Sequence, residues 1–289
     1  MEQLIFTNSQ GEFVLLWNRE PYVLKTIDGT GAVRSEVQTQ KAPYQDGGTY
    51  IDSVLEERDI FIEVGIFAGS NEEVFEHRER LARVFNPKLG LGELRYMYYE
   101  EERYIEVAVV KAPEFPGQDR AAGYQRCLIH LVAPNPLWLS PLITEEPMAA
   151  YTGLFSFPLE IPEEEGIEMG FQIETRTVEN DGDTATPVYI EFFGPAAEPE
   201  VSNNTTGEFI RVNRSISANE KLVIDTEFGN KKVEVEKDDG ERENAFNWID
   251  LESSFWQLQV GENELEYRAE EGQDDATVRI RWRKRYMGV

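Results

Sequence analysis

Apolar side chains recur at every second position between residues 58 and 66, where Ile60, Ile62, Val64 and Ile66 alternate with other residues. Successive side chains of an extended strand point to opposite faces, so these four share one face of a strand. On a helix the same spacing would scatter them around the axis. The stretch therefore predicts a strand with one buried face, which requires neighbouring strands to satisfy its backbone.

Similar short stretches follow one another along most of the chain and are separated by turn-forming residues. In the first half they predict strands at Leu4–Thr7, Phe13–Trp17, Leu94–Tyr99, Tyr104–Val110 and Tyr124–Val132. In the second half they predict strands at Phe171–Val178, Pro187–Phe193, Phe209–Val212, Lys221–Asp225, Lys231–Val235, Trp256–Leu258, Glu264–Arg268 and Thr277–Arg283. Regular short strands without a helical pattern are typical of a jelly-roll β-sandwich, the fold that we predict for the second half.

One helix interrupts the β pattern of the first half. Ser70 and Glu73 have the spacing of a capping box, in which both side chains accept hydrogen bonds from free backbone N–H groups. Apolar residues then recur at three- and four-residue spacing and predict a core-facing stripe, interrupted by Arg78. These residues are Val74, Phe75, Leu81, Ala82 and Phe85. Asn86 and Pro87 end the helix, so the first half is predicted to be a β-domain with one helix.

A proline-rich stretch at residues 133–141 separates two halves of different charge. Residues 1–140 hold 22 acids and 14 bases, whereas residues 141–289 hold 33 acids and 14 bases. A second irregular stretch follows at residues 157–166. We therefore predict an N-terminal domain at residues 1–140, a connector at 141–166 and a C-terminal β-sandwich at 167–289.

The formal net charge of −27 excludes general binding to nucleic acids or anionic membranes, because phosphates would be repelled. With a single cysteine, the chain cannot form an internal disulfide. The first residues lack the basic and apolar regions of a signal peptide, and no run approaches the roughly 18 apolar residues of a membrane span. We expect synthesis in a reducing cytoplasm, without a signal peptide and without membrane insertion.

The residue types of nucleophilic catalysis are scarce. Cys127 and His130 are three residues apart on a predicted strand, which places them on opposite faces and out of hydrogen-bond reach. His77 lies on the predicted helix, and no Gly-x-Ser-x-Gly elbow occurs. Paired carboxylates for glycoside hydrolysis cannot be selected among 55 acids. The sequence therefore predicts that the protein is not an enzyme and has no catalytic residues.

No cofactor or metal site is predicted either. Clustered cysteines and histidines of a zinc site are absent, and Gly29-Thr30-Gly31 lacks the third glycine of a dinucleotide-binding loop. Asn180-Asp181-Gly182-Asp183 offers oxygen ligands for Ca²⁺ but lacks the spacing of a complete calcium loop, and a β-turn is favoured.

Two groups of side chains leave alternatives open. Trp248, Trp256 and Trp282 offer rings for stacking on sugars, although tryptophans in alternating strands usually belong to the core. A basic strip near the C-terminus pairs with neighbouring acids of the same chain or docks on an acidic surface of another subunit. It consists of Arg279, Arg281, Arg283, Lys284 and Arg285.

A set of short motifs, kept in order over both halves, resembles the distal tail proteins of siphoviruses, often called Dit, from phages and prophages of Gram-positive bacteria. In the first half the motifs are Gln45-Asp46-Gly47-Gly48, Glu57-Arg58-Asp59-Ile60, Phe85-Asn86-Pro87, Gly92-Glu93-Leu94, Ala112-Pro113-Glu114-Phe115 and residues 131–138. In the second half they are Asn180-Asp181-Gly182-Asp183, Thr186-Pro187, Ile190, Gly194, residues 203–207, Ile224-Asp225-Thr226, Gly261-Glu262-Asn263 and Arg281-Trp282-Arg283.

The resemblance implies a structural protein of the virion tail tip, made in the cytoplasm of the bacterial host. It implies that the N-terminal domain forms a homohexameric ring and that the C-terminal domain is a galectin-like β-sandwich on the outside of that ring. The implied partners are the tail tube protein, a tail-associated hub protein and, in many members, receptor-binding proteins. DNA would pass through the channel without specific binding, and from the net charge we expect carboxylates on the channel wall. The charged tip Glu100-Glu101-Glu102-Arg103 is expected to project towards a neighbour or the channel.

Two other functions remain as alternatives. The first is a carbohydrate-binding module that recognises host wall polymers through the C-terminal sandwich. The second is a wall-degrading hydrolase, which the missing catalytic residues disfavour.

Overall fold

The computed structural model describes residues 2–31, 33–148, 175–272 and 276–289. It divides into two compact units, which we describe separately. The first unit contains Met1–Pro141 and Arg285–Val289, and the second contains Leu142–Lys284. The predicted connector differs from this division, because residues 144–148 form a strand of the second unit. The part of the predicted connector at residues 149–166 lies outside the described residues.

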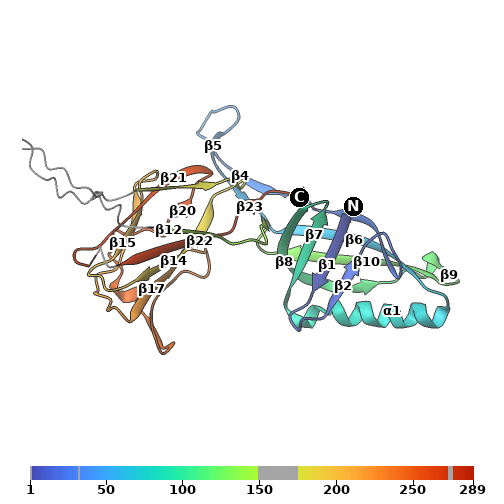
Figure 1. Ribbon diagram of the computed structural model, residues 1–289. Helices are drawn as coiled ribbons and strands as arrows, with labels where there is room; N and C mark the ends of the chain where they lie inside the picture. Colours follow the sequence, from blue (N-terminus) through green and yellow to red (C-terminus); the bar gives the residue numbers. More distant parts are fainter. Residues whose placement is uncertain (1, 32, 149–174, 273–275) are drawn as a thin grey trace, which may run out of the picture. The chain divides into compact units, whose positions relative to one another are not determined.

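The described part of the first unit contains a ten-stranded antiparallel sheet with the main order β2-β1-β7-β8-β10-β6-β3 (Figure 1). Its main strands are β1 (Glu2–Thr7), β2 (Phe13–Leu16), β3 (Tyr22–Asp28), β6 (Arg58–Phe67), β7 (Leu91–Tyr98), β8 (Glu101–Glu114) and β10 (Tyr124–Ala133). Three short strands join it, namely β9 (Arg120–Ala121), β11 (Trp138–Leu139) and β23 (Arg285–Tyr286). A bridge between Trp17 and Val23 links the two ends of this order, so the sheet curls around its core.

The predicted alternation produces the core of this sheet. In β6, Ile60, Ile62, Val64 and Ile66 are all buried, as the period of two requires. The hairpins predicted around Gly11 and around residues 100–103 are confirmed by the pairing of β1 with β2 and of β7 with β8.

The helix α1 (Asn71–Val84) contacts β2, β6, β8 and β10 and covers one end of the core (Figure 1). The Ser70 side chain accepts a hydrogen bond from the backbone N–H of Glu73 at 3.1 Å. The Glu73 carboxylate in turn accepts from the N–H of Gly69 at 2.9 Å, so the reciprocal cap is confirmed with a partner shifted by one residue. Phe85 closes the helix and stacks on Phe6 of β1, with ring centroids 4.3 Å apart.

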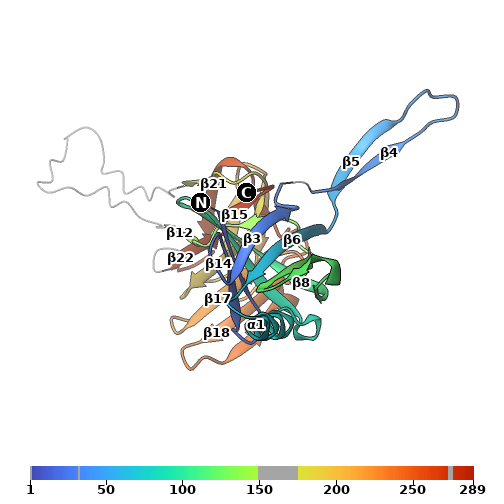
Figure 2. The same cartoon turned by 90° about the vertical axis from the view of Figure 1, so that its right-hand side faces the viewer.

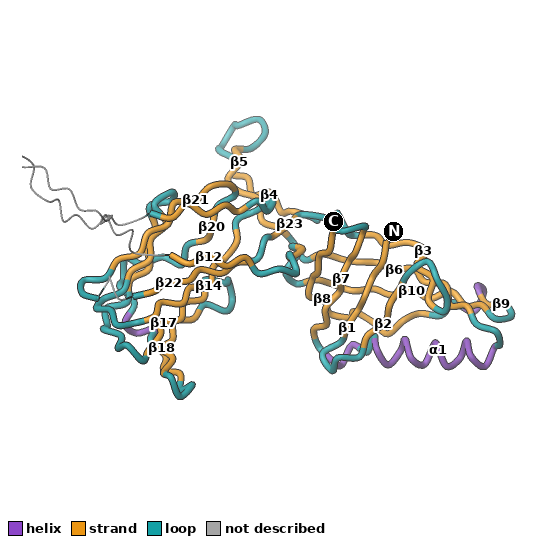
Figure 3. Tube along the Cα trace, in the orientation of Figure 1, coloured by secondary structure: helices purple, strands orange, loops and turns teal. Residues whose placement is uncertain are grey.

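The second unit is a β-sandwich of two antiparallel sheets, drawn as orange strands in Figure 3. The larger sheet contains β12 (Thr144–Met148), β14 (Thr186–Phe193), β17 (Glu220–Asp225), β18 (Lys232–Lys237), β19 (Arg242–Asn244), β20 (Gln257–Leu258) and β22 (Thr277–Trp282). The smaller sheet contains β13 (Arg176–Asn180), β15 (Glu200–Asn203), β16 (Glu208–Arg211) and β21 (Gly261–Arg268). Short 3-10 helices occur at Pro87–Leu89 and Gly117–Asp119 in the first unit and at Phe246–Trp248 in the second.

One core lies between the two sheets of the second unit. It joins Ile190, Phe192 and Ile280 of the larger sheet to Val201 and Leu265 of the smaller one. The predicted fold class is thus confirmed: a mainly β protein with one α-helix among its described residues and a sandwich in the second half.

The chain crosses between the two units twice. It leaves the first unit after Pro141 and returns at Arg285, where β23 pairs with β11 and thereby joins the sheet of the first unit. The sequence prediction assigned these last residues to the second domain. No local pattern signals the return, because β23 contains only two residues and its partner strand lies far away in the sequence.

Candidate functional site

A two-stranded hairpin extends from the first unit between β3 and β6 (Figure 2). Its strands are β4 (Ser35–Gln40) and β5 (Thr49–Leu55), and we call residues 35–55 the arm. Val37 faces Ser53 and Thr39 faces Tyr50 across the pair, with a bulge between Gln38 and Thr39. Among the described residues the arm pairs with no third strand.

Large apolar side chains lie exposed along this arm. Val37, Tyr50 and Ile51 are each more than half exposed, and Tyr44 at the tip is completely exposed. The tip is held by its own contacts: the amide of Gln45 accepts from the N–H of Ala42 at 3.0 Å and donates to Thr49 at 3.2 Å. The arm is therefore an ordered hairpin whose apolar groups contact no core.

A hairpin of this kind is not expected to be stable in water without further contacts. An isolated two-stranded ribbon is at best marginally stable, and each unpaired edge offers backbone groups to another strand. Residues 35–55 hold three acids and one base, a net charge that is in proportion to the −27 of the whole chain. Exposed apolar side chains grouped on one projecting element are typical of a protein–protein contact surface.

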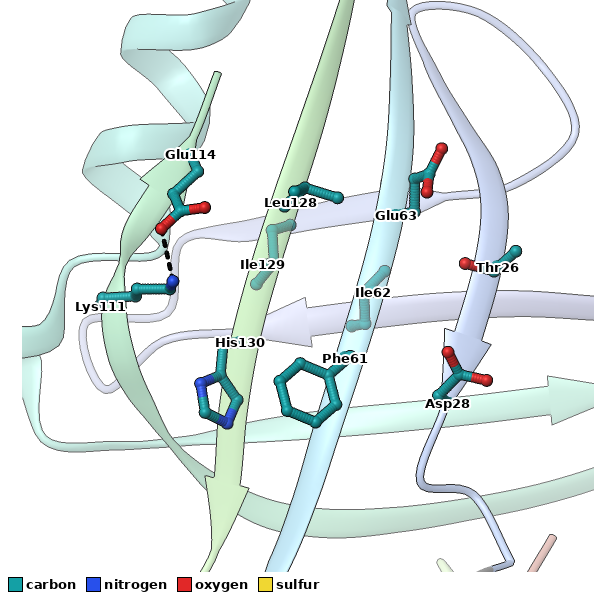
Figure 4. Close-up of a pocket in the computed structure, with 10 residues that line it drawn as sticks. All are labelled: Thr26, Asp28, Phe61, Ile62, Glu63, Lys111, Glu114, Leu128, Ile129 and His130. Carbon is teal, nitrogen blue, oxygen red and sulfur yellow. Dashed lines mark hydrogen bonds and ion pairs between the residues drawn. The ribbon is translucent and has the colours of Figure 1, made fainter. Parts of the chain in front are cut away.

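A shallow hollow of about 200 Å³ opens on the outward face of β3, β6, β8 and β10 (Figure 4). The rings of Phe61 and His130 stack there with centroids 4.3 Å apart, and His130 Nε2 lies 2.7 Å from a carboxylate oxygen of Asp59. Lys111 pairs with Glu114 on β8, the strand next to His130. Lys111 and Glu114 thus pair with each other, and the carboxylates of Asp28 and Glu63 also line the hollow.

The cysteine and histidine lie on opposite faces of β10, as predicted. Cys127 is fully buried in the core, and burial raises the pKa of its thiol to about 12. His130 lies on the outward face with Asp59. The helix histidine, His77, contacts the hydroxyl of Tyr22 at 3.3 Å. No nucleophile and base are brought together by these three residues.

The loop considered for Ca²⁺ is a turn with internal partners. Asn180 is buried, donates to the carbonyl of Thr184 at 3.0 Å and accepts from the N–H of Gly182 at 3.1 Å. Lys284 hydrogen-bonds the Asp181 carboxylate at 2.8 Å and holds its pKa below the usual range. The described residues contain no group of three or more His, Cys, Asp or Glu side chains that could hold a metal ion.

The tryptophans considered for sugar stacking do not present open rings. Trp256 and Trp282 lie in the core of the second unit and are 1% and 3% exposed. Trp248 is half-buried, and the guanidinium of Arg214 lies 4.1 Å from its ring centroid. The interpretation as core residues is confirmed for Trp256 and Trp282.

The basic strip pairs mainly within the second unit. Arg281 lies 3.1 Å from Glu191 of β14, and Arg279 lies 3.9 Å from Glu145 of β12. Lys284 pairs with Asp181, as described above. Of the two alternatives, pairing with neighbouring acids of the same chain is confirmed for these three residues.

The expected charged tip between β7 and β8 is smaller than predicted. Arg103 lies back from the turn, with its guanidinium 3.4 Å from the ring centroid of Tyr286. Glu102 pairs with Arg95 at 3.1 Å. The exposed tip is formed by Tyr99, which is 80% exposed, together with Glu100 and Glu101. Among the described residues, no helix has the length and apolar character needed to cross a membrane.

Comparison with known families identifies both units. Residues 10–133 match the phage tail protein RIFT-related domain, and residues 181–286 match the C-terminal domain of the siphovirus-type tail component. Together these matches cover most of the chain and keep the order of the two units. A comparison with curated proteins gives no significant match.

Solved structures share the fold over nearly the whole chain. The Dit protein (gp 19.1) of phage SPP1, described as a paradigm of the hub adsorption apparatus in phages infecting Gram-positive bacteria, superposes with a TM-score of 0.70. The identity is 12%, and the match covers 98% of each chain. A chain of the phage P2 baseplate in its activated conformation with Ca matches with a TM-score of 0.54 and 11% identity, covering 100% of this chain and 99% of the other. With both domains matched in order, the chain belongs to the siphovirus distal tail proteins.

Proposed function

We propose that the protein is a baseplate hub at the tip of the phage tail, where six copies form a ring. The ring joins the tail tube protein to the tail-associated hub protein and to receptor-binding proteins, and the protein is structural rather than enzymatic. The exposed apolar arm is the observation that carries this proposal, because it is a preformed contact element without a partner strand among the described residues.

A closed ring of identical subunits uses heterologous contacts, in which one surface of each copy binds a different surface of the next. An arm that projects from the body suits the donor side of such a contact. Its exposed apolar groups lose their contact with water when a neighbour covers them, which favours association.

We propose a division of roles between the predicted domains. The predicted N-terminal domain, which includes the arm, carries the ring contacts, and the predicted C-terminal domain without residues 285–289 carries the outward sandwich. DNA passes through the channel without specific binding, because acids outnumber bases in both halves and the channel repels phosphates.

The mass of the particle in solution tests this proposal. Multi-angle light scattering and negative-stain images of the wild-type chain, alone and with its tail tube protein, are expected to show a ring of six 33.2 kDa copies. Val37→Ser combined with Tyr50→Ser is expected to reduce the ring fraction, because both side chains lie exposed on the arm.

The control removes two exposed apolar side chains from the second unit, and these are even more exposed than the two on the arm. Leu251 and Phe228 are 101% and 83% exposed there, so Leu251→Ser combined with Phe228→Ser is expected to leave the ring intact. A wild-type chain that stays monomeric even with its tube protein would refute the ring. Equal ring fractions for the arm variant and the control would refute the role of the arm.

A further inference from the structure

Arg58 is a buried arginine whose hydrogen bonds go to main-chain carbonyls. Its side chain donates to the carbonyls of Pro136 at 2.7 Å, Gly29 at 2.7 Å and Met287 at 2.6 Å. The residue is 1% exposed, and burial lowers the pKa of the guanidinium from its ordinary value. The planar, forked shape of the guanidinium lets one side chain reach three acceptors in different directions.

These three carbonyls come from segments that are distant in sequence. Gly29 directly follows β3 and leads into the arm, Pro136 lies in the proline-rich stretch, and Met287 follows β23 near the C-terminus. Arg58 itself is the first residue of β6, directly after the chain leaves the arm. The guanidinium therefore lies at the root of the arm and links both of its legs to the C-terminal segment.

Two further contacts hold the same root. The ring nitrogen of Trp138 donates to the carbonyl of Thr30 at 3.1 Å. The backbone of Gly288 passes so close that an added Cβ would lie 3.2 Å from the Cα of Gly31.

The backbone path at Gly29 is also tightly constrained. Its φ is +94°, and an added Cβ would lie 2.1 Å from the carbonyl oxygen of Asp59. Only glycine fits this position, so the incoming leg is held against the start of β6.

We propose that Arg58 is a positioning residue that makes the direction of the arm depend on docking of the C-terminal segment, residues 285–289. If that segment leaves, the guanidinium loses the carbonyl of Met287 and its desolvated N–H groups lack one acceptor. The hydrogen bond to the carbonyl of Gly29 then weakens as well, because one planar guanidinium binds both carbonyls. This inference rests on the proposed role of the arm in ring assembly.

Distance measurement between two spin labels tests the coupling directly. The labels are placed at Asp46→Cys in the arm and Glu79→Cys on α1, both exposed, while the native Cys127 is fully buried. Electron–electron resonance of the monomer at low concentration is expected to show one narrow distance peak. Arg58→Met, which keeps the length of the side chain but removes its donors, is expected to abolish this peak.

The control is Arg126→Met, the same substitution in β10. Arg126 pairs with Glu63 at 2.6 Å and with Asp119 at 3.1 Å and is not at the root of the arm, so the narrow peak is expected to remain. Arg58→Lys restores charge and one donor group but cannot span the three carbonyls, so it is expected to restore the peak only in part.

Two milder variants keep the test valid if Arg58→Met fails to fold. Trp138→Phe removes one donor to Thr30, and Gly288→Val inserts a side chain against Gly31. Both are expected to broaden the distance distribution while circular dichroism stays unchanged. A narrow peak in folded Arg58→Met, or in both milder variants, would overturn the proposal, and so would a broad distribution in the wild-type background.

Because the labels are read in the monomer, this result is independent of ring formation. A chain that never assembles but loses its narrow peak in these variants would refute the proposed ring and retain the coupling. A chain that forms rings and keeps a narrow peak in every variant would support the proposed ring and refute the coupling.

Discussion

Cys127 is the one free thiol of the chain, and it lies wholly within the core of the first unit. Burial disfavours the charged thiolate, which is the reactive form, and raises the pKa to about 12. The thiol therefore stays protonated at neutral pH and acts as a small apolar group beside Ile129 and Leu131.

We expect Cys127 to resist thiol reagents in the native protein. Because the folded-state pKa is raised above the ordinary value of 9.0, the thiolate gains population only as pH approaches about 12. Labelling should thus speed up from pH 7 to pH 9 in both states, but at each pH the folded protein should react far more slowly than the unfolded protein. Mass spectrometry after timed exposure measures both rates, with the urea-unfolded chain as the control. Rapid labelling of folded protein at pH 7 would contradict this burial.

Residue-scale features differ in how well the sequence predicts them. The opposite faces of Cys127 and His130 follow from the period of two, and the burial of Trp256 follows from the usual place of tryptophan. The position of Arg58 does not follow, because its acceptors are backbone carbonyls at residues 29, 136 and 287. Every residue has a backbone carbonyl, so the residue types at these three positions give no sign that they accept hydrogen bonds from Arg58.

At the scale of elements, the N-terminal cap of α1 depends on neighbouring residues, whereas its packing depends on strands that are distant in the sequence. The cap can be predicted from residues 69–73, and the distant strands that the helix packs against are β2, β8 and β10. The helix has few buried side chains, namely Val74, Leu81 and Val84. The cap therefore contributes a considerable part of its stability.

Ser70→Ala is expected to lower the free energy of unfolding by about 1 kcal/mol, because the N–H of Glu73 loses its acceptor. Urea unfolding followed by circular dichroism measures the change. Ser53→Ala is the control, since Ser53 lies exposed on the arm and caps no helix. Equal unfolding midpoints for both variants would show that the cap does not stabilise the first unit.

The sequence predicts the hairpins that have short turns, but it does not predict the arm. The pairs β1–β2 and β7–β8 have clear alternation and turn residues close together. In the arm, by contrast, both faces are exposed, so no period of two marks a buried side. A segment that is to be covered by another molecule lacks the pattern that a single chain's core imposes.

At the scale of the whole molecule, the net charge of the chain opposes the proposed ring, whereas the exposed apolar side chains of the arm would favour it. In the proposed ring, six copies with a net charge of −27 each would repel one another at close range. Salt screens that repulsion, with a Debye length of about 10 Å at 0.1 M and about 3 Å at 1 M. Contacts made by apolar side chains of the arm are not weakened in the same way.

The ring fraction is therefore expected to rise with salt. Light scattering at low and high sodium chloride concentrations measures it, with sucrose at matched osmolality as a control for excluded-solute effects. Dissociation of rings at high salt would mean instead that ion pairs between subunits hold them together.

The double crossing between the units has a consequence for the order of events during synthesis. The ribosome makes residues 142–284 before Arg285, which at about 5–20 residues per second takes on the order of ten seconds. Throughout that interval β11 lacks its partner β23, and Arg58 lacks the carbonyl of Met287. The first unit is thus completed only after all of residues 142–284 have been made, although most of its own residues are made first.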